Sequence, residues 1–365
     1  MTADWEILSM KILLNGATGG SNFGDYLFAE IFQNEIEKFI GKENIYWYDS
    51  RYQLSDFYKK HLNYRKKKCR LSEIDALICI SGGYFCGEDK SFKDYIIRYL
   101  RYFRICIKCI NKKIPYIIIG IDVAHSKFKI LDKIQKYVLK NAKIVTVRNV
   151  ESIKTLKEYG ITTGILTADT AHTVDKTLLR ENQKHFEGKN IFFHVQMNRI
   201  NDAQKIIPAL NKFLETHTEY NVYVGTDQLI SNDNSLKELA ARIRAKHVKI
   251  LPFDYPVDLC FILSEMDFII TPKLHVGIVG ATLGKSVLSF SIHSEKISRF
   301  YNQLNESGRS LPMAEFTEEK ALKMMENYYN KPIKIPEYIR NNAFKNLAYV
   351  DDFVKSLPAF QRGEV

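Results

Sequence analysis

Short apolar runs alternate with longer amphipathic stretches along almost the whole chain. In the first half, apolar runs of strand length occur at residues 11–15, 44–48, 76–80, 116–120 and 143–147. Stretches with apolar residues three or four positions apart, typical of helices, occur at residues 25–39, 91–110, 129–141 and 150–160. Strands alternating with helices predict a parallel sheet that is covered by helices.

The second half repeats this pattern, with strands expected at residues 190–195, 221–225, 248–251, 267–271 and 286–290. The polar, charged stretch 176–189 separates the halves, so we expect domains at residues 1–180 and 181–335, with a C-terminal helix (336–365) that packs back on the first. The predicted fold class is α/β, with two Rossmann-like doubly wound domains facing across a cleft. Ligands of such folds bind at the loops that follow the strands.

Two glycine-rich loops follow strands of the first half. NGATGGSNFGD (15–25) runs directly into a helix, whose N-terminal N–H groups can bind an anion. Asn22 and Asp25 are its candidate functional residues. The alternative for Asp25 is a helix cap, which would not explain Asn22. SGGYFCGED (81–89) brings Gly82 and Gly83 to a strand end, where backbone can approach a ligand or simply turn.

Charged side chains mark three further loops. Residues 120–127 contain Asp122, His125 and Lys127, a set more typical of plain surface. Arg148 ends an apolar strand, where either an anionic ligand or a structural carboxylate must pair with it. In residues 290–300, His293 and Lys296 flank the start of a helix, and ordinary solvated charge is the alternative.

The most distinctive segment is ITPKLHVGIVGATLG (270–284). A strand ends at Ile270 or Thr271, Pro272 stops it, and a glycine-rich apolar helix follows. An extended backbone here places Lys273 and His275 on the same side, at the positive end of that helix. A histidine beside an anion site suits acid–base chemistry near neutral pH. The alternative is a buried histidine that caps the helix.

The amino-acid composition indicates a globular protein and favours anionic partners. The chain has 365 residues, 45% of them apolar, which is typical of a folded globular protein. Its 53 basic and 42 acidic residues give a net charge of +11, which favours anionic partners such as phosphorylated small molecules, acidic glycans, nucleic acid or anionic lipid. No signal peptide or membrane-spanning run is evident, and residues 1–9 are expected to have no role in the fold.

The six cysteines do not form a disulfide framework and suit a reducing cytoplasm. Cys106 and Cys109 form a CxxC inside a predicted helix. A redox motif would open a helix after a strand, and a zinc site would need a second ligand pair. We therefore expect two buried thiols on one helix face.

Taken in order, these segments resemble the polysaccharide pyruvyl transferase family. The resemblance spans residues 11–300 and rests on NFGDYL, SGGYF, VRNVESIKTLKEYG, ADTAH, TPKLHVGIVGATLGKSVLSFSI and the following SEK. The sequence departs from the family pattern at Lys273, where arginine is more usual, and at Asn149, where the pattern has aspartate. Lysine keeps the positive charge but loses the bidentate fork of arginine.

The resemblance implies a fold like that of GT-B glycosyltransferases. It also implies transfer of the enolpyruvyl carbons of phosphoenolpyruvate to a sugar, as a ketal, with phosphate released and no metal or nucleotide cofactor. His275 becomes the candidate acid–base catalyst, and Asp25 a weaker candidate on the sugar side. The candidate substrate-binding residues are Arg148, Lys273, Leu274, Lys296, Asn22, Gly82, Gly83 and His293.

The expected acceptor is a sugar of a surface-polysaccharide precursor, such as a capsule or exopolysaccharide, carried on a lipid diphosphate. The basic, tyrosine-rich stretch 51–70 suggests a peripheral contact with the inner face of the cytoplasmic membrane. A solvated surface is the simpler interpretation, and no nucleic-acid motif surrounds the stretch. We therefore expect a cytoplasmic protein without a nucleic-acid partner.

Two other functions remain open from the sequence. A GT-B glycosyltransferase that uses a nucleotide sugar would share the fold, although Asp254 and Asp258 do not form a recognisable ribose-binding pattern. A non-catalytic module of a polysaccharide assembly complex would explain Lys273 as a mark of degeneracy.

Overall fold

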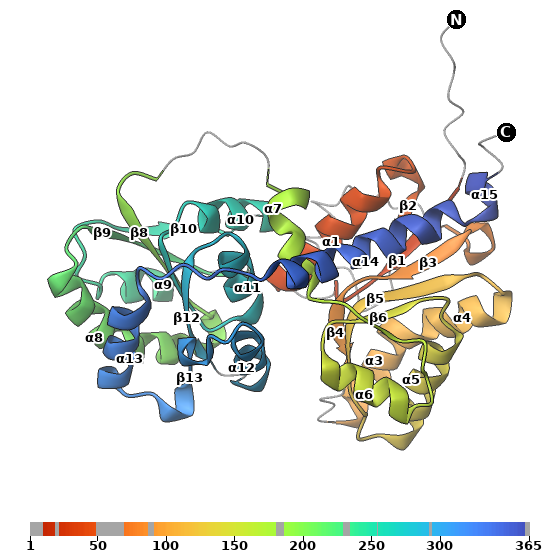
Figure 1. Ribbon diagram of the computed structural model, residues 1–365, viewed down its shortest axis with the longest axis horizontal. Helices are drawn as coiled ribbons and strands as arrows, with labels where there is room; N and C mark the ends of the chain where they lie inside the picture. Colours follow the sequence, from red (N-terminus) through yellow and green to blue (C-terminus); the bar gives the residue numbers. More distant parts are fainter. Residues whose placement is uncertain are drawn as a thin grey trace, which may run out of the picture. The chain divides into compact units, whose positions relative to one another are not determined.

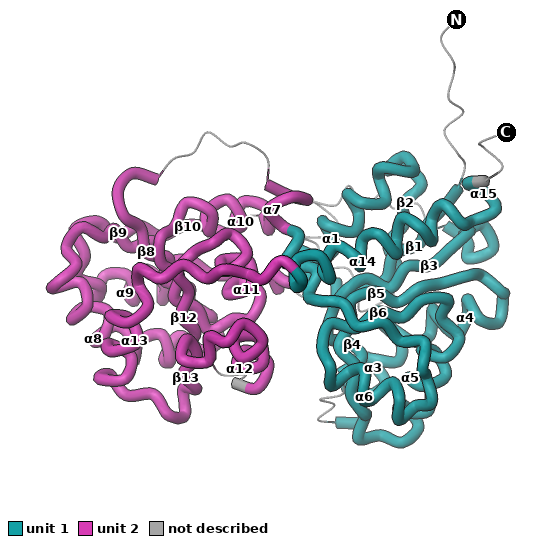
Figure 2. The backbone as a smooth tube through the Cα atoms, in the orientation of Figure 1, with its two compact units in different colours: residues 1–21, 25–173, 338–365 teal, residues 22–24, 174–337 magenta. Residues whose placement is uncertain are grey.

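The computed structural model describes residues 10–18, 22–48, 69–86, 91–179, 186–228, 234–253, 255–291 and 294–361. The chain forms two compact units (Figure 2). The first contains residues 1–21, 25–173 and 338–365, and the second contains residues 22–24 and 174–337. The chain thus enters the second unit at Val174 and returns to the first at Tyr338. Each unit has a parallel sheet with helices, so the predicted α/β class with two Rossmann-like domains is confirmed.

Several predicted features lie outside the described residues. They are residues 1–9, the glycine pair of the first loop at 19–20, residues 51–68 of the basic stretch, Asp254 and His293.

The sheet of the first unit has the strand order β2-β1-β3-β5-β6-β7. All neighbouring strands pair in parallel. The bounds are β1 (Ile12–Asn15), β2 (Ile45–Trp47), β3 (Ala76–Cys79), β5 (Tyr116–Val123), β6 (Val145–Val147) and β7 (Ile165–Leu166).

The segment GGYF, expected to be a loop, is a strand. This strand, β4 (Gly82–Phe85), pairs in parallel with the end of β5. The expectation was wrong because β5 runs three residues beyond the predicted end at Gly120. Its extension pairs Ile121 with Gly82 and Val123 with Phe85. The rings of Tyr84 and Phe85 are both buried.

Helices cover both faces of this sheet (Figure 1). Alternate strand residues such as Leu77 and Ile118 join a core with Ile105 of α4, Leu131 of α5 and Leu156 of α6. The predicted helix at 91–110 is one helical run whose middle five residues adopt the wider π form. The bounds are α1 (Phe23–Ile36), α3 (Phe92–Arg98), the π segment η3 (Tyr99–Phe103), α4 (Arg104–Lys112), α5 (Lys129–Asn141), α6 (Val150–Glu158), α14 (Glu337–Lys355) and α15 (Pro358–Gln361).

A buried polar network attaches α14 to the first unit. Asn346 is fully buried, and its side-chain oxygen accepts a 2.7 Å hydrogen bond from the Thr146 hydroxyl. Its amide nitrogen donates to the carbonyl of Ala168 (2.9 Å) and to the hydroxyl of Thr170 (3.0 Å). Buried polar groups of this kind are costly unless they are paired, so the network fixes one position of the C-terminal helix on the sheet.

The sheet of the second unit has the order β10-β9-β8-β11-β12-β13, again all parallel. The strands are β8 (Lys189–His194), β9 (Tyr220–Gly225), β10 (Val248–Leu251), β11 (Phe268–Thr271), β12 (Ser286–Ser291) and β13 (Ser310–Pro312). The helices are α7 (Val174–Thr177), α8 (Ile200–Thr216), α9 (Asn234–Ala240), α10 (Pro256–Ser264), α11 (Leu274–Thr282), α12 (Ser294–Gln303) and α13 (Glu318–Tyr328).

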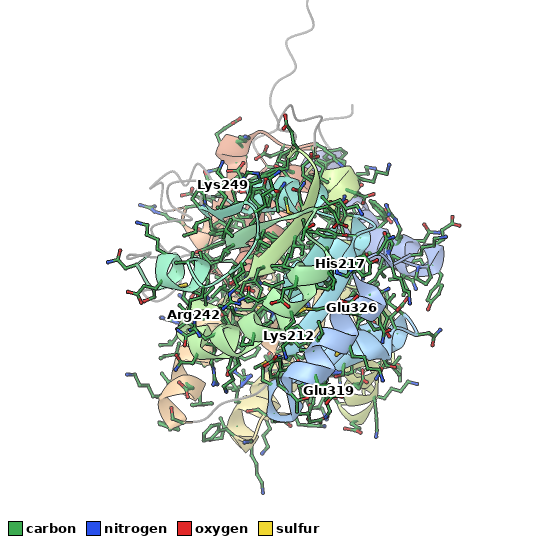
Figure 3. The ribbon with its side chains drawn as sticks, turned by 90° about the vertical axis from the view of Figure 1, so that its left-hand side faces the viewer. Lys212, His217, Arg242, Lys249, Glu319 and Glu326 are labelled. Atoms are coloured by element: carbon green, nitrogen blue, oxygen red, sulfur yellow. The ribbon has the colours of Figure 1, made fainter. Side chains whose placement is uncertain are left out.

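Helices α8 and α13 pack side by side over one face of this sheet, which Figure 3 views from outside. The His217 ring stacks on Phe213 at a centroid distance of 4.1 Å and meets the edge of Tyr329 at 4.6 Å. Its Nε2 lies 3.6 Å from a carboxylate oxygen of Glu326. Lys212 and Glu318 form an ion pair between the two helices, at 2.7 Å. Charges of both signs therefore share this surface.

Two further expectations from the sequence concern the cysteines of the CxxC motif and membrane-spanning helices. Cys106 and Cys109 are both buried on α4, which confirms the interpretation of the CxxC as core thiols. Within the described part of the chain, no helix is long and apolar enough to cross a membrane.

Candidate functional site

Polar side chains gather at the carboxyl ends of three neighbouring strands in the second unit. Strand β8 lies between β9 and β11, so the residues that end these strands are brought together. His194 ends β8, Asp227 follows β9, Thr271 ends β11 and Lys273 comes two residues later. His194 and Asp227 are only 2% and 1% exposed, so their polar groups depend on protein partners.

These four residues form a closed ring of contacts. The Nδ1 atom of His194 hydrogen-bonds the Thr271 hydroxyl at 2.7 Å, and that hydroxyl also accepts the backbone N–H of Lys273 at 3.1 Å. On the other side, Nε2 of His194 lies 3.4 Å from one carboxylate oxygen of Asp227. The second oxygen of Asp227 lies 3.4 Å from the Lys273 ammonium. The ring thus fixes both the backbone and the side chain of Lys273.

Asp227 is held as a carboxylate. Its burial alone would raise the pKa, but the nearby His194 and the charge of Lys273 outweigh burial, and the pKa lies below its ordinary value. The Lys273 side chain is 20% exposed, so solvent reaches part of it while Asp227 holds its ammonium.

Lys273 is the N-cap of α11, and His275 lies in the first turn of this helix. The Lys273 ammonium has donors only and makes no cap hydrogen bond, so it leaves the N-terminal N–H groups of α11 to other acceptors. A lysine charge and a helix N-terminus at one place favour an anion there. Leu274 is the first residue of the helix and is half-buried, as is His275.

The imidazole of His275 packs directly against the backbone of Gly24. A Cβ atom placed on Gly24 would lie only 2.0 Å from Nδ1 of His275 and 2.5 Å from its Cγ. Residues 22–24 and the TPKLH segment, far apart in the sequence, therefore meet in the second unit. The side-chain oxygen of Asn22 accepts the backbone N–H of Gly24 at 3.3 Å. Asn22 thus caps α1, so the expectation that a cap would not explain Asn22 was wrong.

Asp25, in the first turn of α1, lies in the first unit near a pair of tyrosines. The rings of Tyr84 and Tyr102 stack with centroids 4.6 Å apart. Burial, with a smaller effect of the Asp25 charge, raises the pKa of Tyr102 to about 12. A Cβ on Gly82 would come within 2.9 Å of the Tyr84 ring, whereas one on Gly83 would meet open space. The structure thus brings Asp25 close to the tyrosine pair that borders the GG segment.

Arg148 is paired with two carboxylates. Its Nε donates to Asp122 at 2.9 Å, its Nη2 donates to the other oxygen of the same carboxylate, and its Nη1 donates to Asp169 at 2.6 Å. Burial alone would lower the pKa of Arg148, but the charges of Asp122 and Asp169 raise it above its ordinary value. Of the two interpretations left open for this residue, the structural ion pair is present. Substrate binding by Arg148 stays a prediction.

Asn149, where the family pattern has aspartate, makes two different bonds. Its oxygen accepts the backbone N–H of Ser152 at 2.8 Å and so caps α6. Its nitrogen donates to Asp122 at 2.5 Å. An aspartate could cap the helix but could not donate this second bond, and it would place another carboxylate beside Asp122.

The other predicted residues are more dispersed. Lys296 is half-buried near the start of α12. His125 lies at the surface of the first unit between Asp132 (3.2 Å) and Glu158 (2.7 Å), and the hydrogen bond that its ring donates to Glu158 is the main cause that raises the pKa of His125. Lys127 is exposed. Among the described residues, no group of three or more His, Cys, Asp or Glu side chains could hold a metal ion.

The sequence of residues 22–294 matches the model of the polysaccharide pyruvyl transferase family. The chain belongs to this family. A comparison with curated proteins gave no significant match.

Solved structures with a similar fold include enzymes of the GT-B class. S. aureus MnaA, solved with UDP, matches with a TM-score of 0.62 and 12% identity over 95% of this chain and 96% of that one. The UDP-GlcNAc 2-epimerase from Neisseria meningitidis, bound to UDP-GlcNAc, gives 0.61 and 13% over 95% and 100%. Acinetobacter baumannii MurG gives 0.51 and 13% over 95% and 100%. At these identities the likeness concerns the fold alone.

In this polysaccharide pyruvyl transferase family member, sequence reasoning missed His194 and Asp227. The run NIFFHV was interpreted only as a strand, although a histidine near the end of an apolar run is a polar residue at a ligand-facing position. Asp227 stands two residues after Gly225, where β9 ends. Their position after strands was a usable signal, but their contact with Lys273 depends on the strand order.

Proposed function

We propose that this protein transfers pyruvate from phosphoenolpyruvate to two hydroxyl groups of one sugar, forming a cyclic ketal and releasing phosphate. The acceptor in this proposal is a sugar of a surface-polysaccharide precursor on a lipid-diphosphate carrier. Family membership supports the general reaction class. The observation that carries the proposal is the arrangement at α11, where Lys273, fixed by the His194–Asp227–Thr271 ring, and His275 share one helix N-terminus.

Donor binding follows from the charge of the donor. Phosphoenolpyruvate carries a carboxylate and a phosphate, so its site must supply positive charge and N–H donors. Lys273 and the first N–H groups of α11 supply both in one place. We assign the donor to this position, with Leu274 beside it and with Lys296 as a further cation of the same unit.

The reaction needs proton transfers that suit a histidine. Two sugar oxygens form bonds to C2 of the donor, and the bond from C2 to the phosphate oxygen breaks. One hydroxyl proton ends on C3, which becomes a methyl group, and the other leaves with phosphate. We assign the transfer of these protons to His275, since imidazole can give and take protons near neutral pH. Asp25, which follows Gly24 directly in the chain, is our candidate on the sugar side.

The decisive experiment measures phosphate released from phosphoenolpyruvate in the presence of a panel of lipid-linked sugar acceptors. We expect His275→Ala to abolish release while the variant keeps the wild-type melting temperature. His247→Ala, a change of an exposed histidine in the same unit, serves as the matched control and should keep full activity. Full activity of His275→Ala would show that the central assignment is wrong.

The same panel distinguishes other functions. Release of UDP from UDP-sugars without phosphate release would identify a glycosyltransferase instead. No release of either product would favour a non-catalytic role in polysaccharide assembly. The proposed reaction involves no metal and no nucleotide, so phosphate release should be unchanged by excess EDTA, and its loss on chelation would contradict this part of the proposal.

A further inference from the structure

One part of the first unit carries a large excess of positive charge. Residues 91–141 contain twelve lysines and arginines against three acidic residues, a net charge of +9. Of the three acidic side chains, Asp122 is buried in its ion pair with Arg148, and Asp132 bonds His125 and the Tyr159 hydroxyl. Asp94 alone among these three is exposed.

Helix α5 carries a lysine stripe within this region. Lys129, Lys133, Lys136 and Lys140 are all exposed, and their spacing of three or four residues places them along one side of the helix. The opposite side, with Leu131, Val138 and Leu139, is buried in the core. The stripe therefore faces outward from the unit along the length of α5.

Large apolar side chains are exposed beside these lysines. On α5, Ile130 is 66% exposed and Tyr137 is 48% exposed. On α3, Phe92 is 63% exposed and Ile96 is 40% exposed. The two helices adjoin, because the ring of Phe92 lies 6.4 Å from that of Phe128, the residue that precedes α5 (Figure 1). Exposed apolar groups of this size mark interaction sites when they cluster.

We infer that this surface, the α3–α5 face, docks on an anionic lipid bilayer. It is defined by the apolar residues Phe92, Ile96, Ile130 and Tyr137 and by the basic residues Lys93, Lys129, Lys133, Lys136 and Lys140. Lysines attract the anionic headgroups, and the apolar side chains enter the boundary between headgroups and acyl chains. A nucleic acid would satisfy the lysines but would leave the aliphatic side chains of Ile96 and Ile130 exposed to water.

The face contrasts with the surface of α8 and α13 in the second unit. There, Lys212 pairs with Glu318, and Glu319 and Glu326 lie on the same exposed side (Figure 3). A mixed surface of this kind offers no net attraction for an anionic bilayer. The inference is independent of the pyruvyl transfer reaction, because it rests on charge and exposure alone.

The test is co-sedimentation of the full chain with vesicles of phosphatidylcholine alone and with vesicles of equal parts phosphatidylcholine and phosphatidylglycerol. We expect binding to the anionic vesicles that weakens with added salt. Changing Lys129, Lys133, Lys136 and Lys140 to Gln should lower the partition coefficient by at least about a hundredfold, since each lysine near such a surface contributes about fivefold. The matched control changes Lys246, Lys249, Lys323 and Lys334, exposed lysines of the second unit, to Gln and should bind like the wild type.

A second pair of variants tests the apolar part. Phe92→Ser combined with Ile130→Ser should lower vesicle binding by about tenfold or more, because both side chains lose their insertion into the bilayer. Tyr338→Ser, a change at a residue 62% exposed on α14, is the control and should have no effect. Thermal melts confirm that each variant is folded.

Three outcomes would overturn the inference. Equal binding to neutral and anionic vesicles would remove the electrostatic argument. An equal loss in the α5 and control lysine variants would show a general effect of net charge. Tight binding to a single-stranded oligonucleotide that depends on the α5 lysines but not on Phe92 and Ile130, without vesicle binding, would assign the face to a nucleic acid.

Discussion

Replacing Gly24 by alanine adds one methyl group at the point where the backbone of Gly24 meets His275. The added Cβ would stand 2.0 Å from Nδ1, 2.5 Å from Cγ and 2.7 Å from Cε1 of that imidazole. All three of these atoms belong to the His275 ring, so this ring must move to relieve the clash. To restore an ordinary contact of 3.4 Å, His275 has to move by about 1.4 Å or turn into another rotamer.

The consequence for activity is large compared with the consequence for folding. A displacement of about 1 Å at a catalytic group costs roughly 10²-fold in rate, which corresponds to about 2.7 kcal/mol of transition-state stabilisation. In a helix, alanine is intrinsically favoured over glycine by up to about 1 kcal/mol, which offsets part of any strain. We therefore expect Gly24→Ala to lose about a hundredfold in kcat/KM and to change the melting temperature by only a few degrees.

The assay is phosphate release from phosphoenolpyruvate, combined with a ¹H–¹³C spectrum of the histidine rings as a readout that needs no turnover. Gly277→Ala on α11 is the matched control, because its added Cβ would meet nothing closer than the Tyr301 hydroxyl at 3.5 Å. In a His275→Ala background, Gly24→Ala should leave the melting temperature no lower than that of His275→Ala alone, since the clashing ring is gone. Wild-type kcat/KM and an unshifted His275 signal in Gly24→Ala would refute the packing argument.

Three further predictions concern stability. Asp227→Asn leaves the charge of Lys273 without its carboxylate, so the free energy of unfolding should fall by about 2 kcal/mol and the melting temperature by several degrees. Adding Lys273→Met should restore part of this loss. An unchanged melting temperature in Asp227→Asn would contradict the pairing. Burial and the charge of Glu35 raise the pKa of Asp351 to about 6, so the folded state binds this proton more tightly and stability falls as pH rises from about 4 to about 6. Asp351→Asn should abolish this dependence and add about 1 kcal/mol in urea unfolding at pH 7.5; an unchanged pH profile would count against it. Asn346→Leu leaves its buried partners unpaired and should cost about 2–4 kcal/mol in the same assay, and a cost near zero would show that water replaces the bonds.

Much of the fold could be predicted from the sequence, because helices and strands depend on the local spacing of apolar residues. Helix α5 begins and ends at the predicted residues, since its buried leucines and exposed lysines repeat with helical spacing. Helix α9 ends at Ala240, although the amphipathic run SLKELAARIRAK continues to Lys246. The cause is a tertiary contact: the side chain of Asn211 on α8 donates to the carbonyl of Arg242 (3.0 Å) and accepts the N–H of Arg244 (2.8 Å). These bonds take the backbone groups that a longer α9 would need.

Only part of the candidate site could be predicted from the sequence, because some of its residues come together only through the order of the strands. Lys273 and His275 stand out in the sequence because Pro272 ends a strand immediately before them and a helix begins with them. The contacts that link His194 and Asp227 to Lys273 depend on the position of β8 between β9 and β11. No local sequence pattern reveals this strand order.

The two departures from the family pattern have local physical explanations. Lys273 is a single point charge without the fork of arginine, and Asp227 together with the Thr271 hydroxyl orients it from the ammonium and from the backbone. Asn149 caps α6 and donates to Asp122, which an aspartate could not do. Neither departure leaves a buried charge unpaired. Lys273 therefore gives no physical reason to interpret the site as degenerate, and a loss of activity in this chain would need a cause elsewhere.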